Sequence, residues 1–254
     1  MAGNQAGNRM GKWSEIRVGG HLCEAFEPAQ RMDSGDVLVY LHGADLDRLV
    51  DQPVFENAFD KHGVKVLAPQ TGRSWWTDKI FPEFDPELTA ERHVLKNILP
   101  WIASNWGAGP PQIGLLGTGM GGQGALRFAF KYPDTFPVVA ALSPEIDYQS
   151  CWNEGDETLP QMYCDAEAVR QDTATLHIHP LYWPRNIWFC CDPEDCRWLD
   201  SSQRLQMKLG ALGIPHQCNL EPHTGSGLDP HSNKVEVAME FLAERLDQER
   251  HRII

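Results

Sequence analysis

Six residues, GTGMGG at positions 117–122, follow a short apolar run, open a helical pattern and could do chemistry in two ways. By spacing they form G-x-G-x-x-G, a turn whose backbone N–H groups cradle phosphate. By their surroundings they form the strand–turn–helix motif G-x-S-x-G, in which the serine is an exposed nucleophile and Gly119 occupies its position. A glycine turn without chemistry is the third interpretation.

The phosphate interpretation predicts a dinucleotide such as NAD or FAD as ligand. Glu145 lies roughly the right distance along the chain to accept a ribose hydroxyl. However, the dinucleotide motif belongs to the first strand–helix turn of its fold, whereas at least three predicted strands precede residue 117 here. The spacing alone is therefore weak evidence for nucleotide binding.

Short β-branched runs alternate with longer periodic stretches along the chain. We expect strands at 15–18, 36–43, 64–69, 112–117, 137–143, 187–192 and 215–221. Expected helices cover 86–106, with Asp85 as cap and a kink at Pro100, then 122–132, 201–213 and 233–246. This alternation predicts one α/β domain over 1–254, with a doubly wound, mostly parallel sheet and helices on both faces. Residues 144–184 break the rhythm and predict a cap-like excursion over the carboxyl edge.

Two segments together resemble a known family. The run DVLVYLHGAD ends an expected strand in His-Gly, and LLGTGMGGQGALRFAFKYPDTFPVVAALSP joins an expected strand, a turn and a helix. The second segment is similar, nearly residue for residue, to the Putative esterase family of the α/β-hydrolase fold, which includes S-formylglutathione hydrolases and feruloyl esterases. The weaker resemblance extends over most of residues 36–245. It implies an α/β-hydrolase fold and a small ester, acyl or sugar-linked ligand.

The resemblance implies site residues and one departure. Gly119 stands at the nucleophile position, so the turn has no attacking oxygen, and Thr118, one place earlier, is no substitute. Glycine adopts the strained backbone of such a turn readily. The resemblance assigns the oxyanion hole to the backbone N–H groups of Met120 and Ala44. Trp75 and Trp76 follow a strand's carboxyl end, where they line a pocket or simply pack.

The acid and the base implied by the family fit less well. In CCDPEDC, Asp195 matches the family's acid, with Asp192 as the alternative. The non-catalytic interpretation is a solvated acidic turn ahead of a helix. Counting back from the last helix places the family's histidine at Ser226 or Gly227. His231 comes about four residues too late and His223 too early. We therefore expect a catalytically impaired or non-catalytic protein, with an ester hydrolase using His231 and Asp195, or one whose serine was removed, as the alternative.

Composition excludes several other classes. The formal charge of −13 and the lack of a Lys/Arg cluster argue against nucleic acid and anionic membranes as partners. The start has no apolar signal region, and seven scattered cysteines fit reduced thiols, which together predict a cytoplasmic protein. His177 and His179 have metal-compatible spacing, but without a nearby third ligand we expect structural histidines, no metal and no cofactor. The oligomeric state is left open.

Overall fold

A computed structural model describes residues 11–30, 35–194, 196–221 and 230–252. Eight strands form one sheet in the order β1-β2-β4-β3-β5-β6-β7-β8. Their bounds are β1 (Lys12–Val18), β2 (His21–Glu27), β3 (Val37–Leu41), β4 (Lys65–Pro69), β5 (Ile113–Thr118), β6 (Val138–Leu142), β7 (Asn186–Cys190) and β8 (Gln217–Asn219). β2 pairs antiparallel with β1 and β4, and every later neighbour pairs in parallel, which confirms the expected mostly parallel sheet.

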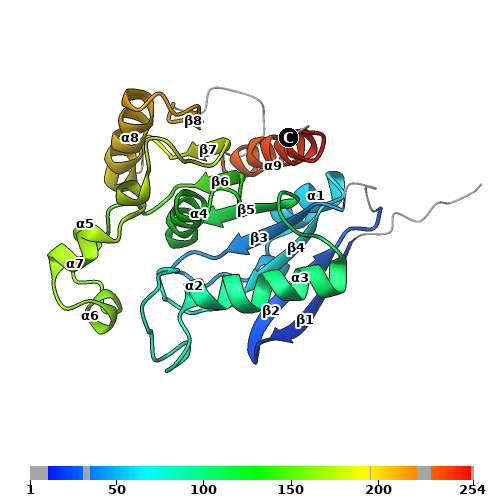
Figure 1. Cartoon of the computed structure of the whole chain (residues 1–254), viewed down its shortest axis with the longest axis horizontal. Helices are drawn as coiled ribbons and strands as arrows, with labels where there is room; N and C mark the ends of the chain where they lie inside the picture. Colours follow the sequence, from blue (N-terminus) through cyan, green and yellow to red (C-terminus); the bar gives the residue numbers. More distant parts are fainter. Residues whose placement is uncertain (1–10, 31–34, 195, 222–229, 253–254) are drawn as a thin grey trace, which may run out of the picture.

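Helices cover both faces of this sheet (Figure 1). The larger helices are α1 (Pro53–Lys61), α2 (Ala90–His93) running through the π-helical turn η2 (Val94–Ile98) into α3 (Leu99–Trp106), α4 (Met120–Lys131), α8 (Cys196–Ala211) and α9 (Pro230–Arg250). A short 3-10 turn, η1 (Leu49–Asp51), precedes α1.

Strand residues alternate between two separate hydrophobic cores. Val37 and Val39 of β3 pack in the core beneath α3, α4 and α8, whereas Leu38 and Tyr40 pack in the core beneath α1 and α9. Because side chains alternate along a strand, an uninterrupted apolar run such as VLVYL is what a sheet covered on both faces requires. All five residues of that run are buried.

Three elements differ from the expectation drawn from the sequence. The helix expected from Pro86 begins at Ala90 instead, with the Thr89 hydroxyl accepting from the Arg92 N–H at 3.1 Å. Asp85 does cap, but it caps a turn: its Oδ1 accepts from the backbone N–H groups of Glu87 and Leu88, each at 2.8 Å. Strand β2 (His21–Glu27) and helix α1 (Pro53–Lys61) were not predicted from the sequence.

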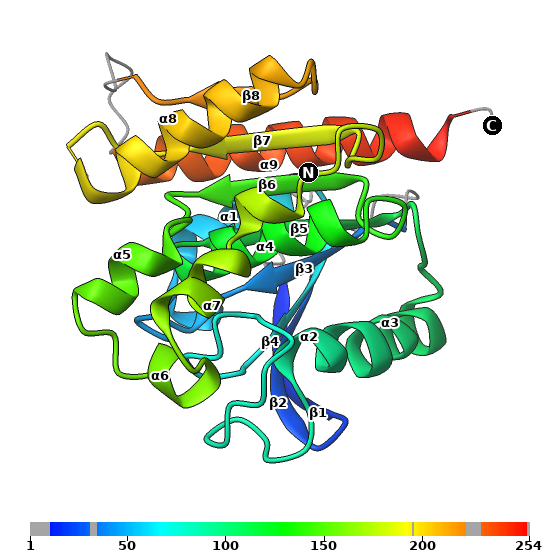
Figure 2. The ribbon, with the colours of Figure 1, turned by 60° about the vertical axis from the view of Figure 1, so that its left-hand side comes forward.

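The segment after β6 forms short helices. They are α5 (Tyr148–Asn153), α6 (Leu159–Met162), α7 (Ala166–Gln171) and the 3-10 turn η3 (Ala174–His177). Figure 2 shows α5, α6 and α7 grouped together to one side of the sheet. Within the described residues, no helix is long and apolar enough to cross a bilayer.

Candidate active-site elbow

The turn between β5 and α4 has the geometry of a nucleophile elbow. Gly119 lies at its apex with φ 57° and ψ −120°, a conformation that residues with a Cβ adopt at a cost of about 1–3 kcal/mol. Its N–H donates to Leu142 O at 2.9 Å, and its carbonyl accepts from the N–H groups of Gln123 and Glu145, each at 3.1 Å. These bonds tie the apex to both β6 and α4.

The neighbouring glycines are required by close backbone approach. A Cβ on Gly121 would lie 1.9 Å from Leu41 O, and one on Gly117 would lie 2.1 Å from Gly121 O. No side chain fits at such separations, so the turn needs these glycines whatever stands at its apex. Close packing of α4 against β3 and β5 therefore accounts for Gly117 and Gly121 without any phosphate.

The Glu145 carboxylate lies next to the position that a side chain of residue 119 would take. A Cβ built on Gly119 has its three nearest atoms among the described residues all in Glu145, with Oε1 at 3.1 Å, Cδ at 3.7 Å and Cγ at 3.9 Å. A serine hydroxyl would extend from that same Cβ. Sequence reasoning named Glu145 only as a ribose partner, because nothing in SPEID shows that its side chain folds back over the preceding turn.

The loop after β3 lies beside the elbow, as the oxyanion-hole assignment requires. A Cβ on Gly43 would lie 3.2 Å from Thr118 O, which brings the loop carrying Ala44 against the end of β5. Ala44 itself is half-buried, and its carbonyl accepts from Arg73 Nε at 2.9 Å. Met120 is fully buried at the first position of α4. That the backbone N–H groups of Ala44 and Met120 act as oxyanion donors stays a prediction.

His42 holds this loop in place as a neutral imidazole. Its Nε2 accepts from the Thr71 N–H at 3.1 Å, which leaves Nδ1 to donate to Gly43 O at 2.9 Å. Burial lowers the pKa of His42 to about 4, because a charged ring would be desolvated there. The histidine of the His-Gly pair therefore positions the loop.

Trp75 and Trp76 pack beneath the same loop. Both side chains are buried, at 2% and 0% exposure, and both have left-handed backbones with φ of 52° and 56°. Trp76 Nε1 donates to His42 O at 3.2 Å, and Trp75 Nε1 donates to Thr158 Oγ1 at 3.0 Å. The structure thus shows both indoles in packing roles that support the loop and the excursion; contact with a ligand stays a prediction.

Of the residues expected as acid and base, the structure describes Asp192 and His231. Asp195 and His223 lie outside the described residues, as do Ser226 and Gly227. Asp192, the alternative acid, pairs with Lys234 Nζ at 2.8 Å, and this bond lowers the pKa of its carboxyl. His231 is exposed in the first turn of α9, with its ring 5.9 Å from the Phe55 ring of α1.

A buried ionic network, which the sequence analysis missed, anchors α4 to the excursion. Arg127 is 1% exposed; its Nε and Nη2 donate to Asp172 Oδ1 at 3.0 and 2.7 Å, and its Nη1 donates to Glu91. Tyr163 and His177 also bond Asp172, at 2.7 and 2.9 Å. The signal was weak, since one arginine in an apolar helix pattern does not reveal its partners 36 and 45 residues away.

His177 is thus a structural partner of Asp172, and His179 Nδ1 accepts from the Leu181 N–H at 3.1 Å. Within the ranges that the structure covers, no group of three or more His, Cys, Asp or Glu side chains is arranged to hold a metal ion.

Known proteins share this architecture. Residues 14–251 match the family model described as Putative esterase. Among solved structures, the substrate-bound fluorophosphonate-binding serine hydrolase FphF of Staphylococcus aureus superposes with a TM-score of 0.70 at 14% identity, covering 94% of this chain and 99% of that chain. An S-formylglutathione hydrolase of Agrobacterium tumefaciens gives 0.67 at 16% identity, covering 93% and 94%.

MPT51 (FbpC1) of Mycobacterium tuberculosis gives a TM-score of 0.70 at 16% identity, covering 94% of this chain and 98% of that chain. At these identities the likeness concerns the fold alone, which is that of the α/β-hydrolases. A search of curated proteins found no match.

Proposed function

Because the chain belongs to the Putative esterase family and has the α/β-hydrolase fold, we propose that it is a single-domain member that has lost Ser-His-Asp catalysis. The observation that carries this proposal is the elbow itself. Its backbone holds the geometry that presents a nucleophile, but its apex is Gly119, which has no side-chain oxygen, and Glu145 Oε1 lies 3.1 Å from the position that a Cβ of residue 119 would take.

The absence of a nucleophilic oxygen at residue 119 is the largest loss of catalytic capacity. In another hydrolase, removal of the triad serine lowers kcat by roughly 10⁶, equivalent to about 8–9 kcal/mol of barrier. The Glu145 carboxylate adds negative charge beside the apex, where an ester would be bound for attack. That arrangement opposes acyl transfer, because the elbow of an active hydrolase stabilises an oxyanion.

The rest of the site supports the same proposal. His231 packs against Phe55, and Asp192 is paired with Lys234, so these two groups serve other contacts. In this proposal the protein acts by binding a small ligand, and ester turnover is vestigial. A cytoplasmic location is part of the proposal, supported by the six cysteines that the structure describes as free thiols.

Turnover of p-nitrophenyl acetate and butyrate tests the proposal. We expect the native protein to match a boiled sample. Sustained turnover well above that sample, lost in a His231→Ala variant, would instead establish an esterase that uses His231 with Asp195. Restoration of turnover by Gly119→Ser would establish a serine esterase whose nucleophile had been removed.

One observation favours a second function, hydrolysis by a carboxylate. Glu145 Oε1 lies 3.1 Å from the Cβ position at the apex, where it could deprotonate a water molecule that attacks an ester. Turnover that persists in His231→Ala but disappears in Glu145→Gln would establish this function. Nucleotide binding at GTGMGG, the remaining alternative, predicts a thermal shift with NAD or FAD.

A further inference from the structure

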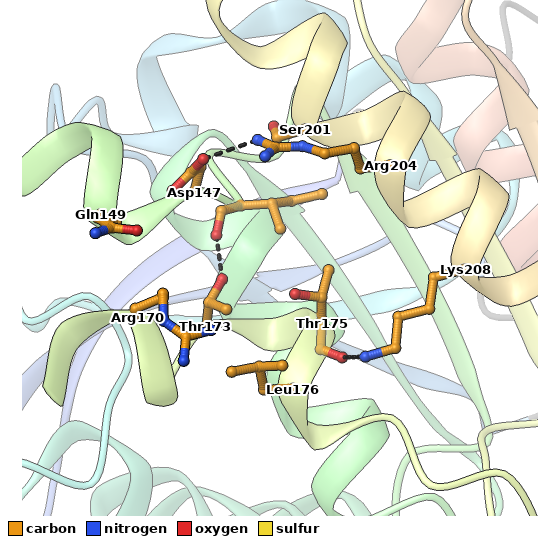
Figure 3. A pocket seen from close by; sticks show the side chains of 10 residues that line it. Asp147, Gln149, Arg170, Thr173, Thr175, Leu176, Ser201, Arg204 and Lys208 are labelled. Carbon is orange, nitrogen blue, oxygen red and sulfur yellow. Dashed lines mark hydrogen bonds and ion pairs between the residues drawn. The ribbon is translucent and has the colours of Figure 1, made fainter. Parts of the chain in front are cut away.

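A cavity of about 250 Å³ lies between the excursion and α8 (Figure 3). Arg204 and Lys208 enter it from α8, and Arg170 enters it from α7. Ile146 and Leu176 provide apolar wall, and Asp147 is the carboxylate among the lining side chains. Gly119 is not part of this lining, so the cavity is distinct from the elbow.

The lining carries three cationic side chains against one carboxylate, in a chain whose formal net charge is −13. Two further carboxylates act from outside the lining: Glu167 pairs with Arg170 at 2.7 Å, and Asp200 pairs with Arg204 at 3.1 Å. These carboxylates are 61% and 71% exposed, and their partners Arg170 and Arg204 are 43% and 53% exposed, so water screens both pairs. Lys208 is therefore the positive charge of this lining that no carboxylate among the described residues offsets.

Several donors of these cations are left for a ligand. Arg204 uses Nη2 for Asp147 at 2.8 Å and for Asp200, while its Nε and Nη1 have no protein partner among the described residues. Arg170 holds Glu167 through Nε and Nη2, each at 2.7 Å, and Nη1 likewise has no partner in the described chain. Asp147 thus holds the Arg204 guanidinium against the cavity wall. The Nε and Nη1 groups of Arg204 remain able to donate to a ligand.

Lys208 differs from the other two cations in its partner. Its Nζ donates to Thr175 O at 2.5 Å, and two of its three protons remain for other acceptors. Burial lowers the pKa of this ammonium group. Its bond is to a neutral carbonyl, so an anionic ligand would supply the charge partner that this partly buried group lacks within the described residues.

We propose that this cavity binds a small organic anion through Arg204 and Lys208. Guanidinium and ammonium donors are the groups that recognise phosphate and carboxylate oxygens. The volume is at the small end for ligand sites, which limits the ligand to roughly ten non-hydrogen atoms. Ile146 and Leu176 add a short apolar surface for its carbon body.

Isothermal titration calorimetry at low ionic strength tests this inference with three probes: inorganic phosphate, glycerol 3-phosphate and succinate. Uncharged glycerol is the ligand control. The variants are Arg204→Gln and Lys208→Gln, and Lys96→Gln removes one exposed positive charge from the π-helical turn η2 as the matched control. Thermal melts check that each variant is folded, since Arg204 also contacts Asp147, which caps α5.

We expect saturable binding of at least one probe with a Kd below about 1 mM, no binding of glycerol, and a weakening of about tenfold or more in Lys208→Gln and Arg204→Gln. Lys96→Gln should bind like the native protein. Preference for succinate or for the phosphates identifies which anionic group the site takes. No saturable binding of any probe, or unchanged binding in folded Lys208→Gln, would overturn the inference. Binding is measured without turnover, so this result is independent of the proposed loss of catalysis.

Discussion

The Glu145 carboxylate stands over Gly119, with Oε1 3.1 Å from the position of the absent Cβ. The two residues are also joined through their backbones, since the Glu145 N–H donates to Gly119 O at 3.1 Å. A Cβ at residue 119 would therefore require the Glu145 side chain to move by a few tenths of an ångström.

A serine at the apex should destabilise the fold and restore no activity. Gly119→Ser puts a Cβ on a backbone with φ 57° and pushes against Glu145, so we expect the free energy of unfolding to fall by about 1–3 kcal/mol. Gly109→Ser is the matched control, because a Cβ there meets nothing within 4 Å. Urea unfolding measures both. A Gly119→Ser protein as stable as Gly109→Ser, or active on p-nitrophenyl butyrate, would refute this prediction.

Removing the glutamate should relieve part of that cost. In a double-mutant cycle with Glu145→Ala, we expect Gly119→Ser to be less damaging by about 0.5 kcal/mol or more, because the new Cβ no longer meets a carboxylate. The coupling is obtained from the unfolding free energies of the four proteins. Strict additivity would show that the two side chains do not compete for the same space.

Loss of the buried arginine should be far more damaging than loss of an exposed one. Arg127→Met leaves the carboxylates of Glu91 and Asp172 buried without their guanidinium, and we expect a loss of about 3–5 kcal/mol. Arg92→Met breaks an exposed pair with Asp78 and should cost less than about 1 kcal/mol. Chemical denaturation of both variants checks the contrast, and equal losses would contradict it.

The buried His42 should make stability fall in mild acid. Its pKa is lowered to about 4 in the folded protein, against about 6.5 when unfolded, so between these values the unfolded chain binds a proton that the folded chain does not. The stabilisation is complete above pH 6.5 and is lost as the pH falls towards 4, by on the order of 3 kcal/mol.

Unfolding free energies measured from pH 7 to pH 4.5 test this for the native protein and for His42→Gln. The variant should show the shallower decline. His251→Gln, at the exposed end of α9, should keep the native profile. If His42→Gln declines as steeply as the native protein, the imidazole of His42 does not cause the acid sensitivity.

The fold was predictable from the sequence because the central strands β3 and β6 are uninterrupted, fully buried apolar runs. β2 escaped prediction since HLCEAFE interrupts its apolar positions with Glu24, a buried carboxylate whose Oε2 accepts from the Leu49 N–H at 2.9 Å. The helix start moved because Asp85 and Thr89 both offer a side-chain cap, and local chemistry alone does not choose between them.

The elbow was predictable as a turn, and Gly119 as its apex, since glycines at 117 and 121 are dictated by close backbone contacts. What stands above the apex was not predictable. The position of Glu145 depends on how the chain leaves β6, and that of His231 depends on the packing of α9 on α1, and neither relation is encoded in a local motif.

Intact-protein mass spectrometry after incubation with a fluorophosphonate, and separately with p-nitrophenyl acetate, tests the central claim most directly. An elbow with glycine at its apex has no oxygen to acylate or phosphonylate, so we predict an unchanged mass for the native protein in both experiments. A stoichiometric single adduct that maps to the peptide spanning residues 113–127, or to Glu145, would contradict the account.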